Sequence, residues 1–497
     1  MILTALLAVL ALQMPPPEAP ATDEHGDPKS LTKQAIPEVD YEAAGRRTLA
    51  ERLAVERREG PARNVIVFIA DGMDVTTATA ARILGGQRAG GPGEDHVLTF
   101  ETLPHTALTK TYTTDTQVAD SAGTATAILS GHKTKSGVIN VHQSVERGDC
   151  EGAEGHRLPT IADLATRTGR ATGVVTTARL THATPAAFYA SSPDRDWESD
   201  ADLPSGSACA DIASQLIARR DELGLRVALG GGARAFTPDR EREDGRDLTA
   251  AWAEDGTVVR TADELASLSR DSGPVLGLFS DSHMDYEADR EGDQPSLADM
   301  TRFAIQRLSA DEDGYVLLVE GGRVDHAHHA GNAARALIDT LAFDEAVAAA
   351  VEVVDLDETL VIVTADHGHT LAFQGYPRRG NPVLGIVKST GGGEHEAEMA
   401  ADGRPYPTLS YANGPGARHL LKAGGPRPEL TDDQAQNVDY LQVSAIPSFS
   451  ETHGGQDVAV YAAGPGAWVV GGVLEQNVLY YVIENAMIPP SSASDTP

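Results

Sequence analysis

One short stretch, EGGRVDHAHHAGN at residues 320–332, contains one glutamate, one aspartate and three histidines. It follows an apolar run, YVLLV at 315–319, that is typical of a buried strand. Asp325 and His329 are four residues apart, so a helical turn would place both on one face. Mixed carboxylate and imidazole groups suit zinc, whereas sets of oxygen ligands suit magnesium. We therefore predict that Glu320, Asp325 and His329 belong to a metal site at the end of a core strand.

Similar side chains recur in three other stretches. In two of these stretches they stand at the end of an apolar run. They are Asp71 in NVIVFIADG (64–72), Asp366, His367 and His369 in ETLVIVTADHGH (358–369), and His453 in ETHGGQD (451–457). Any single histidine of this kind is more often a satisfied or solvated side chain than a ligand. Open α/β sheets, however, carry their chemistry at the carboxyl ends of their strands. The complete set, placed at strand ends, therefore favours a metal centre.

A candidate nucleophile lies in VADSAGTATAILSGHKTKSG at residues 118–137, where Ser121 follows an aspartate and precedes a helix-compatible run of small residues. A serine at a helix start faces backbone N–H groups and the positive end of the helix dipole, which suits an anionic substrate. The alternative is a serine that only caps the helix. The segment has no Gly-x-Ser-x-Gly motif and no adjacent histidine. If Ser121 is a nucleophile, a metal must therefore activate it.

The apolar runs also predict the fold class. Further runs occur at 170–178 and 225–232, and helical patterns such as AARALIDTLAFDEAVAAAVEV (333–353) separate them. Strands that alternate with helices indicate an α/β fold, a three-layer α/β/α domain around a central, mostly parallel sheet. The expected divisions are a signal peptide at 1–21, an N-terminal helical arm at 22–62, a catalytic domain at 63–375 and 447–487, an irregular cap-like insertion at 376–446, and a tail at 488–497.

The composition narrows the range of partners and compartments. The net charge of −33, from 73 acidic and 40 basic residues, argues against a surface that binds nucleic acid or anionic membranes. The start, MILTALLAVLAL, is too short to span a bilayer as a helix, and a Pro-rich, acidic segment with Ala-Pro-Ala at 19–21 follows it. We therefore expect a signal peptide, a periplasmic or secreted protein, and no membrane span. Cys150 and Cys209 fit no zinc motif and would form one disulfide in an exported protein, or else remain two buried thiols.

Five motifs, in the same order, resemble those of alkaline phosphatases. They are NVIVFIADGM (64–73), VADSAGTATA (118–127), EGGRVDHAHH (320–329), TADHGH (364–369) and THGGQDVAVYAAGP (452–465). The resemblance extends from about residue 63 to 487, and it is closer to the animal-type than to the enterobacterial enzymes because His182 stands where the latter have an acid. It implies a metal-dependent hydrolase that releases phosphate and an alcohol from phosphomonoesters through a phosphoserine. It also implies two zinc ions, one magnesium ion and a homodimer.

The resemblance implies a role for each matching residue. Ser121 is the expected nucleophile, and Arg195, in PDRDWESD (193–200), is the expected clamp on the phosphate. The expected ligands are Asp325, His329 and His453 for the first zinc, Asp71, Asp366 and His367 for the second, and Asp71, Thr184 and Glu320 for magnesium. Three divalent ions would make the local field positive, so the acidic surface would not prevent phosphate binding.

Four further histidines lie close to these positions in the sequence. His182 and His326 match positions that tune the metals without binding them, whereas His328 and His369 match no ligand position. We expect THATPA (181–186) to be extended, which would point the side chains of His182 and Thr184, two residues apart, the same way. His182 would then lie beside the magnesium site.

Two other places bear on the resemblance. Animal-type enzymes have an additional calcium site that includes a glutamate after a Leu-Phe pair, but LGLFSDSHMDYE (276–287) has Ser280 there, which argues against a calcium ion. The segments around Cys150 and Cys209, in contrast, resemble those of a disulfide in the family.

Two alternative functions remain open from the sequence. A phosphodiesterase or phosphomutase of the same metal-hydrolase superfamily would usually lack the magnesium ligands and the arginine clamp. In that case Thr184, Glu320 and Arg195 would lie away from the metals. A non-catalytic secreted protein that binds metal or phosphate would bind metal without turning over a phosphomonoester.

Overall fold

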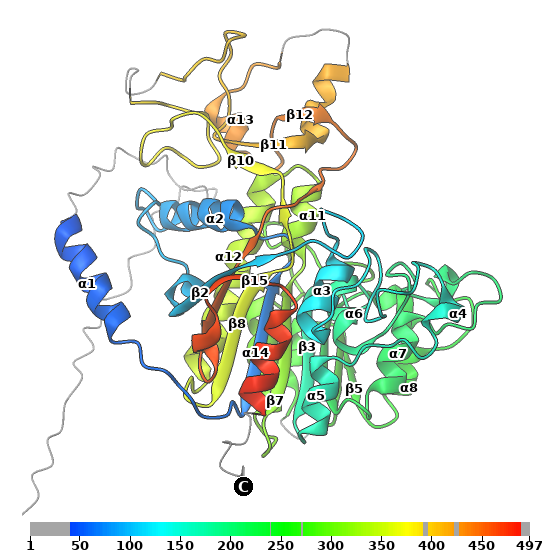
Figure 1. The fold of residues 1–497 in the computed structure, drawn as a ribbon. Helices are drawn as coiled ribbons and strands as arrows, with labels where there is room; N and C mark the ends of the chain where they lie inside the picture. Colours follow the sequence, from blue (N-terminus) through cyan, green and yellow to red (C-terminus); the bar gives the residue numbers. More distant parts are fainter. Residues whose placement is uncertain (1–39, 239, 270–271, 391–395, 422–426, 489–497) are drawn as a thin grey trace, which may run out of the picture.

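The computed structural model describes residues 40–238, 240–269, 272–390, 396–421 and 427–488. The predicted signal peptide, and the predicted tail beyond residue 488, lie outside the described residues. Within the described part of the chain, ten strands form a sheet in the order β15-β2-β14-β8-β1-β7-β3-β4-β6-β5 (Figure 1). Their bounds are β1 Asn64–Ala70, β2 His105–Lys110, β3 Ala171–Arg179, β4 Leu225–Gly231, β5 Thr257–Val259, β6 Val275–Leu278, β7 Tyr315–Gly321, β8 Thr359–Ala365, β14 Val458–Ala463 and β15 Gly472–Glu475.

The sheet is mostly parallel, as the sequence predicts. β1 pairs in parallel with β7 and β8, and β3 pairs in parallel with β4 and β7. β14 runs antiparallel to both of its neighbours, β8 and β2. Every apolar run that the sequence analysis interprets as a core strand is a strand of this sheet. The carboxyl ends of the parallel strands therefore meet at one edge, where polar side chains from distant segments come together.

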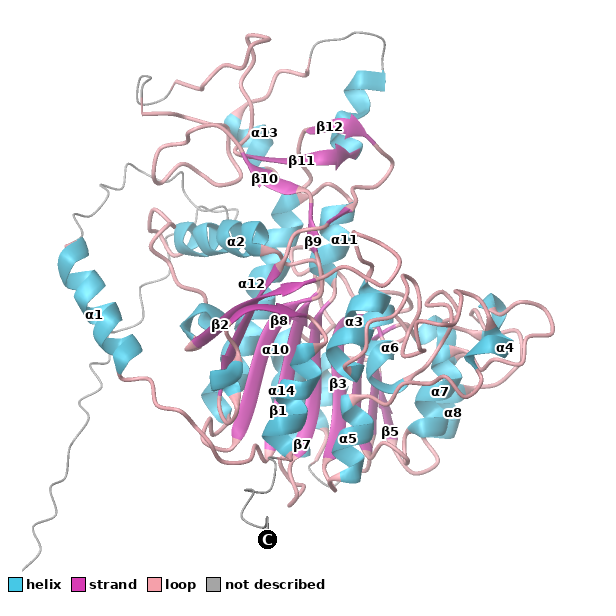
Figure 2. Cartoon of the chain, viewed as in Figure 1, coloured by secondary structure: helices cyan, strands magenta, loops and turns pink. Residues whose placement is uncertain are grey.

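Helices cover both faces of the sheet (Figure 2). One face packs against α3 Ser121–Ser130, α5 Ile161–Arg167, α6 Ala183–Tyr189 and α14 Val478–Met487, and the other against α10 Leu297–Leu308 and α12 Ala333–Val353. α2 Val75–Arg88 packs mainly against α12. Along β1, Val65 and Val67 belong to the first apolar cluster, whereas Ile66 and Phe68 belong to the second. Successive side chains of a strand point to opposite faces, so an uninterrupted apolar run specifies a strand buried on both sides. The fold is thus the predicted α/β class.

A smaller sheet lies above the carboxyl edge of the main sheet (Figure 1). It consists of β10 Leu371–Phe373, β11 Leu409–Gly414 and β12 Ser444–Pro447, with α13 Asp432–Gln436 beside it. The segment expected to be irregular thus contains ordered strands, and the sheet begins five residues before position 376. Between the two sheets, β9 Gly368–His369 pairs with β13 His453–Gly454, which places His369 opposite His453.

The chain before the main sheet contains the helix expected in the N-terminal arm. α1 Tyr41–Leu53 begins after Asp40, whose side chain accepts a hydrogen bond from the backbone N–H of Ala43. This helix lies to one side of the domain (Figure 1), and none of its own residues is buried. Among the helices of the described residues, none has the length and apolar character needed to cross a membrane.

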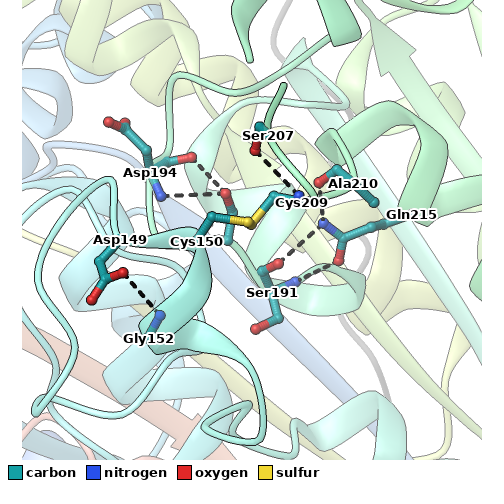
Figure 3. The surroundings of a disulfide bond; sticks show 10 residues. Asp149, Cys150, Gly152, Ser191, Asp194, Ser207, Cys209, Ala210 and Gln215 are labelled. Carbon is teal, nitrogen blue, oxygen red and sulfur yellow. Dashed lines mark hydrogen bonds between the residues drawn. A yellow bond between two sulfur atoms is a disulfide. The ribbon is translucent and has the colours of Figure 1, made fainter. Parts of the chain in front are cut away.

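Cys150 and Cys209 form a disulfide, with their Cα atoms 5.7 Å apart (Figure 3). Cys150 begins α4 Cys150–Ala153, and Cys209 shortly precedes α7 Ile212–Arg219. The bond joins positions separated by 59 residues in the sequence. Of the two alternatives for these cysteines, the bridge is therefore the one that the structure contains.

The remaining helices are α8 Leu248–Trp252, α9 Ala262–Ser267 and α11 Arg323–His329.

Candidate active site

The carboxyl ends of three neighbouring strands bring acidic side chains together. Asp71 follows β1, Glu320 is the penultimate residue of β7, and Asp366 follows β8. All three side chains are buried. Burial and the nearby acids raise the pKa of Asp71 well above its usual value, and burial raises the pKa of Glu320 to about 8. So many buried carboxylates can ionise together only if cations offset their repulsion.

Asp325, His329 and His453 converge at this edge of the sheet. Asp325 and His329 lie one turn apart on α11, as predicted, and His453 lies on β13. Nε2 of His453 is 3.0 Å from Nε2 of His329 and 3.2 Å from Oδ1 of Asp325. Nε2 of His329 is 3.4 Å from the same oxygen. A tetrahedral zinc ion with bonds of about 2.0–2.1 Å would hold its ligand atoms about 3.3 Å apart.

The hydrogen bonds of the two imidazoles leave a lone pair on each inner nitrogen. Nδ1 of His329 lies 2.6 Å from the carbonyl oxygen of Glu451, and Nδ1 of His453 lies 2.7 Å from that of Ala119. Because a carbonyl oxygen only accepts, Nδ1 carries the proton in each ring. Two lone pairs and a carboxylate oxygen cannot hydrogen-bond to one another, whereas a metal ion would satisfy all three. The donors therefore fit zinc.

Asp71, Asp366 and His367 form a second group, with Ser121 beside it. Nε2 of His367 is 3.4 Å from Oδ1 of Asp71 and 3.3 Å from Oδ2 of Asp366. Oγ of Ser121 is 3.1 Å from the same nitrogen and 3.3 Å from Oδ1 of Asp71. These separations also match the edges of a tetrahedron around zinc. The serine hydroxyl thus lies at a corner of the group, where a cation would face its oxygen.

A third group contains Glu320, Thr184, His182 and Asp71. Oε2 of Glu320 accepts a short hydrogen bond from the hydroxyl of Thr176. Oε1 of Glu320, Oγ1 of Thr184 and Nδ1 of His182 are buried and have no hydrogen-bond partner among the residues that the structure describes. Buried polar atoms without partners are costly and call for an explanation. A magnesium ion, which takes oxygen ligands, would satisfy the glutamate and threonine oxygens.

His182 itself has the extended backbone that we predict for 181–186, but the residues that follow it are helical. α6 begins at Ala183, so His182 is the N-cap residue and Thr184 lies in the first helical turn. The prediction is wrong because the first turn of a helix does not use its N–H groups and therefore accepts Pro185. Helical geometry nevertheless brings the side chain of Thr184 and that of His182 into the same buried group.

Ser121 is the first residue of α3, but it does not cap the helix. Asp120 is the N-cap residue, and its side chain accepts hydrogen bonds from the backbone N–H groups of Ala122 and Gly123. The hydroxyl of Ser121 contacts His367 and lies in the buried site, where the serine is 2% exposed. The capping alternative for Ser121 is therefore excluded.

Arg195 lies beside the start of this helix. Its Nη1 donates to Oδ2 of Asp120 at 2.9 Å, and its Nη2 donates to Nε2 of His182 at 3.1 Å. Burial alone would raise the pKa of Asp120, but Arg195 and backbone donors such as Gly137 hold it below its usual value. The guanidinium is thus fixed by the residue that directly precedes Ser121.

The other predicted histidines differ in their surroundings. The ring centroids of His182 and His326 are 5.3 Å apart, and His283, which the sequence analysis does not identify, lies 4.0 Å from His326. Burial lowers the pKa of His326 to about 3, so this side chain is neutral. His328 is buried, and both of its ring nitrogens contact hydroxyl groups, including that of Tyr411 at 2.7 Å. His328 is therefore a satisfied core residue.

Two acidic residues of the site are not identified from the sequence. Asp120 orients Arg195, and Glu451 contacts His369, whose other ring nitrogen lies 2.9 Å from Asp325. Burial opposes a charge on His369, but these two carboxylates raise its pKa to about 10. Asp120 lies inside the motif that supplies the nucleophile, and Glu451 directly precedes the motif that supplies His453; these positions are the signal that could have identified both acids.

The fold and the site together define a metal-dependent hydrolase of the α/β class. Its clusters of carboxylate and imidazole groups lie at the carboxyl ends of parallel strands, with a buried serine among them. The chain belongs to the alkaline phosphatase family, whose sequence model matches residues 62–488.

Known relatives agree with this assignment. The chain is 39% identical over 465 residues to the tissue-nonspecific isozyme of alkaline phosphatase from Gallus gallus, covering 88% of this chain and 87% of the relative. It is 41% identical over 460 residues to a membrane-bound alkaline phosphatase from Bombyx mori, covering 85% and 81%. The crystal structure of Thermus thermophilus alkaline phosphatase superposes with a TM-score of 0.63 at 28% identity, covering 87% of this chain and 92% of that one. The protein is therefore a metal-dependent phosphomonoester hydrolase, as the sequence predicts.

Proposed function

We propose that the protein hydrolyses phosphomonoesters through a phosphoserine at Ser121, with two zinc ions and one magnesium ion bound. The observation that carries the proposal is the position of Ser121 Oγ, 3.1 Å from Nε2 of His367 and 3.3 Å from Oδ1 of Asp71. The proposed ligands are Asp325, His329 and His453 for the first zinc, Asp71, Asp366 and His367 for the second, and Asp71, Thr184 and Glu320 for magnesium. When bound, the ions would stabilise negative charge on the attacking and leaving oxygens.

The proposed reaction has two successive displacements at phosphorus, first by Ser121 and then by water. Arg195 binds two phosphate oxygens, which its planar fork matches. Oγ of Ser121 attacks phosphorus, the ester P–O bond breaks, and the serine proton ends on the departing alcohol. Water then attacks the phosphoserine, the bond between phosphorus and the serine oxygen breaks, and one water proton returns to Ser121. The products are inorganic phosphate and an alcohol.

Two contacts favour this function over the superfamily alternatives. A phosphodiesterase or phosphomutase would leave Thr184 and Arg195 away from the metals. Instead, the buried hydroxyl of Thr184 belongs to the group around Glu320, and Arg195 is bound to Asp120 at the start of α3. A non-catalytic metal- or phosphate-binding protein would have no need for a buried serine directed at these ligands.

The test compares a chromogenic phosphomonoester with a matched phosphodiester, each with and without a chelator. We expect much faster turnover of the monoester, and loss of that turnover when the metals are removed. A preference for the diester would contradict the proposal. Acid quenching during turnover, followed by peptide mass analysis, should detect one phosphoryl group on Ser121. A phosphoryl group on another residue would reject the proposed intermediate.

We also propose a homodimer in the periplasm or outside the cell, in line with a signal peptide at 1–21. The disulfide supports an oxidising compartment. Exposed apolar side chains on the cap, Phe373, Tyr376, Ile446 and Phe449, support a contact between copies. Light scattering after size-exclusion chromatography measures the mass in solution, and a monomer at micromolar concentration would contradict the dimer.

An additional calcium ion is not part of the proposal. Ser280, which stands where animal-type enzymes have a glutamate, donates its hydroxyl to the carbonyl oxygen of Ser282 at 2.7 Å. Asp281 is paired with Arg240. The guanidinium of Arg240 beside Asp281 disfavours a cation at this position. Elemental analysis of the protein after zinc and magnesium loading should find no stoichiometric calcium.

A further inference from the structure

A buried carboxylate outside the proposed ligand set contacts the first zinc group. Glu451 is 1% exposed and lies two residues before His453. Its Oε2 accepts a hydrogen bond from Nδ1 of His369 at 2.6 Å. Its Oε1 accepts from the backbone N–H and the hydroxyl of Thr370, at 2.7 and 2.6 Å. Three donors hold this carboxylate in one position, as expected of a fully satisfied buried polar group.

His369 connects Glu451 to a proposed zinc ligand. Nε2 of His369 lies 2.9 Å from Oδ1 of Asp325. Both nitrogens of the ring thus face carboxylate oxygens, which accept hydrogen bonds. The ring therefore bridges two acids, in agreement with the absence of a matching ligand position in the sequence.

The main chain of Glu451 orients a second ligand. Its N–H donates to the carbonyl oxygen of His329 at 2.9 Å, and its carbonyl oxygen accepts from Nδ1 of His329 at 2.6 Å. This pair of bonds places the Nε2 lone pair of His329 on the metal side. Two residues later, His453 is paired with His369 across β9 and β13. Glu451 is therefore tied to all three ligands of the first group.

We propose that Glu451 is a positioning residue for the first zinc: its side chain, acting through His369, holds Asp325 in the orientation that binds the ion. This inference rests on the proposed function, because it takes the first ligand group as a zinc site. Partners that orient metal ligands contribute about 10- to 100-fold to metal affinity. The effect should be confined to the first zinc, because the hydrogen bond of the Glu451 side chain to His369 leads to Asp325, a ligand of the first group.

The test measures zinc affinity in three variants of the full chain: Glu451→Gln, His369→Gln and the double variant. Zinc is titrated against a chromophoric chelator, which reports binding without a substrate. We expect each single variant to weaken one zinc equivalent per chain about 10- to 100-fold and to leave the other unchanged. Because both residues act through the same chain of hydrogen bonds, the double variant should lose no more zinc affinity than the single variant with the larger loss.

Asp211→Asn is the matched control. Asp211 is another buried carboxylate, 3% exposed, and it caps α7 and pairs with Arg242 away from the site. Its substitution should lower thermal stability without changing zinc affinity. Wild-type zinc affinity in either single variant, equal weakening of both zinc equivalents, or multiplicative losses in the double variant would each overturn the role of Glu451. If Glu451→Gln does not fold, His369→Gln alone decides, with the same outcomes. A wild-type chain that binds fewer than two zinc ions would instead reject the proposed function.

Discussion

Oγ of Ser121 and Nε2 of His367 are 3.1 Å apart, although 246 residues separate them in the chain. The helix start that carries the serine and the strand end that carries the histidine meet only in the folded sheet. A serine without a basic partner is a weak nucleophile at neutral pH. Its position against the proposed ligands of the second zinc is therefore the feature on which the proposed chemistry depends.

Ser121→Ala should nearly abolish steady turnover of a phosphomonoester while both zinc ions stay bound. Removal of a nucleophile that acts with neighbouring groups costs several orders of magnitude in kcat. The measurement is kcat together with zinc content. Ser130→Ala, a buried serine at the other end of the same helix, is the control and should retain activity. If the Ser121 variant keeps more than about a tenth of the wild-type kcat, a loss of only ~1.4 kcal/mol in barrier height, Ser121 is not the nucleophile.

His182→Asp should strengthen magnesium retention. The side chain of His182 belongs to the group with Asp71 and Glu320, and a carboxylate suits a hard cation better than imidazole does. Magnesium content after dialysis against a weak chelator measures the effect. Activity after reconstitution with zinc alone should also fall relative to zinc plus magnesium. The exposed His156→Asp is the control, and equal magnesium in wild type and the His182 variant would mean that His182 does not influence this site.

The disulfide should contribute to stability. Closing a loop of 59 residues between Cys150 and Cys209 is worth about 4 kcal/mol in the chain-entropy model. Thiol titration of the denatured, unreduced protein should find no free thiol, and the double substitution to serine should lower the unfolding free energy in denaturant. Two reactive thiols per chain would show that the protein lacks the bridge.

Asp339→Asn should stabilise the protein at alkaline pH. Burial raises the pKa of Asp339 to about 8, although its carboxyl group accepts hydrogen bonds from the N–H of Glu287. Between pH 4 and 8 this group is ionised in the unfolded chain but protonated in the folded chain. The unfolding free energy of the wild type therefore falls as pH rises, by at most about 1.4 kcal/mol per pH unit.

The measurement for Asp339 is the thermal midpoint of metal-free protein from pH 5 to 9. The gap between Asp339→Asn and wild type should be small at pH 5, widen up to pH 8 and then remain constant. Glu312→Gln, at an exposed acid, should show no such widening. A gap that is independent of pH would mean that Asp339 titrates as it does in the unfolded chain.

Local patterns predicted most of the elements that carry the site. Each uninterrupted apolar run became a strand buried on both faces, and the helical pattern at 333–353 became α12 with the same bounds. Asp325 and His329 could be paired from the sequence because residues four apart on a helix lie on the same face. The cap sheet was missed because its strands span only three to six residues in a Gly- and Pro-rich segment, and they pair with partners far away in the sequence.

By itself the sequence determined which side chains stand at the ends of core strands, because apolar periodicity and spacing are properties of neighbouring residues. Tertiary structure alone decided that Asp120 rather than Ser121 caps α3, and that His182 is the N-cap residue of a helix. It also decided that Glu451 reaches Asp325 through His369. These arrangements depend on which hydrogen-bond partners burial makes available, and that depends on segments brought together by the parallel sheet from hundreds of residues apart.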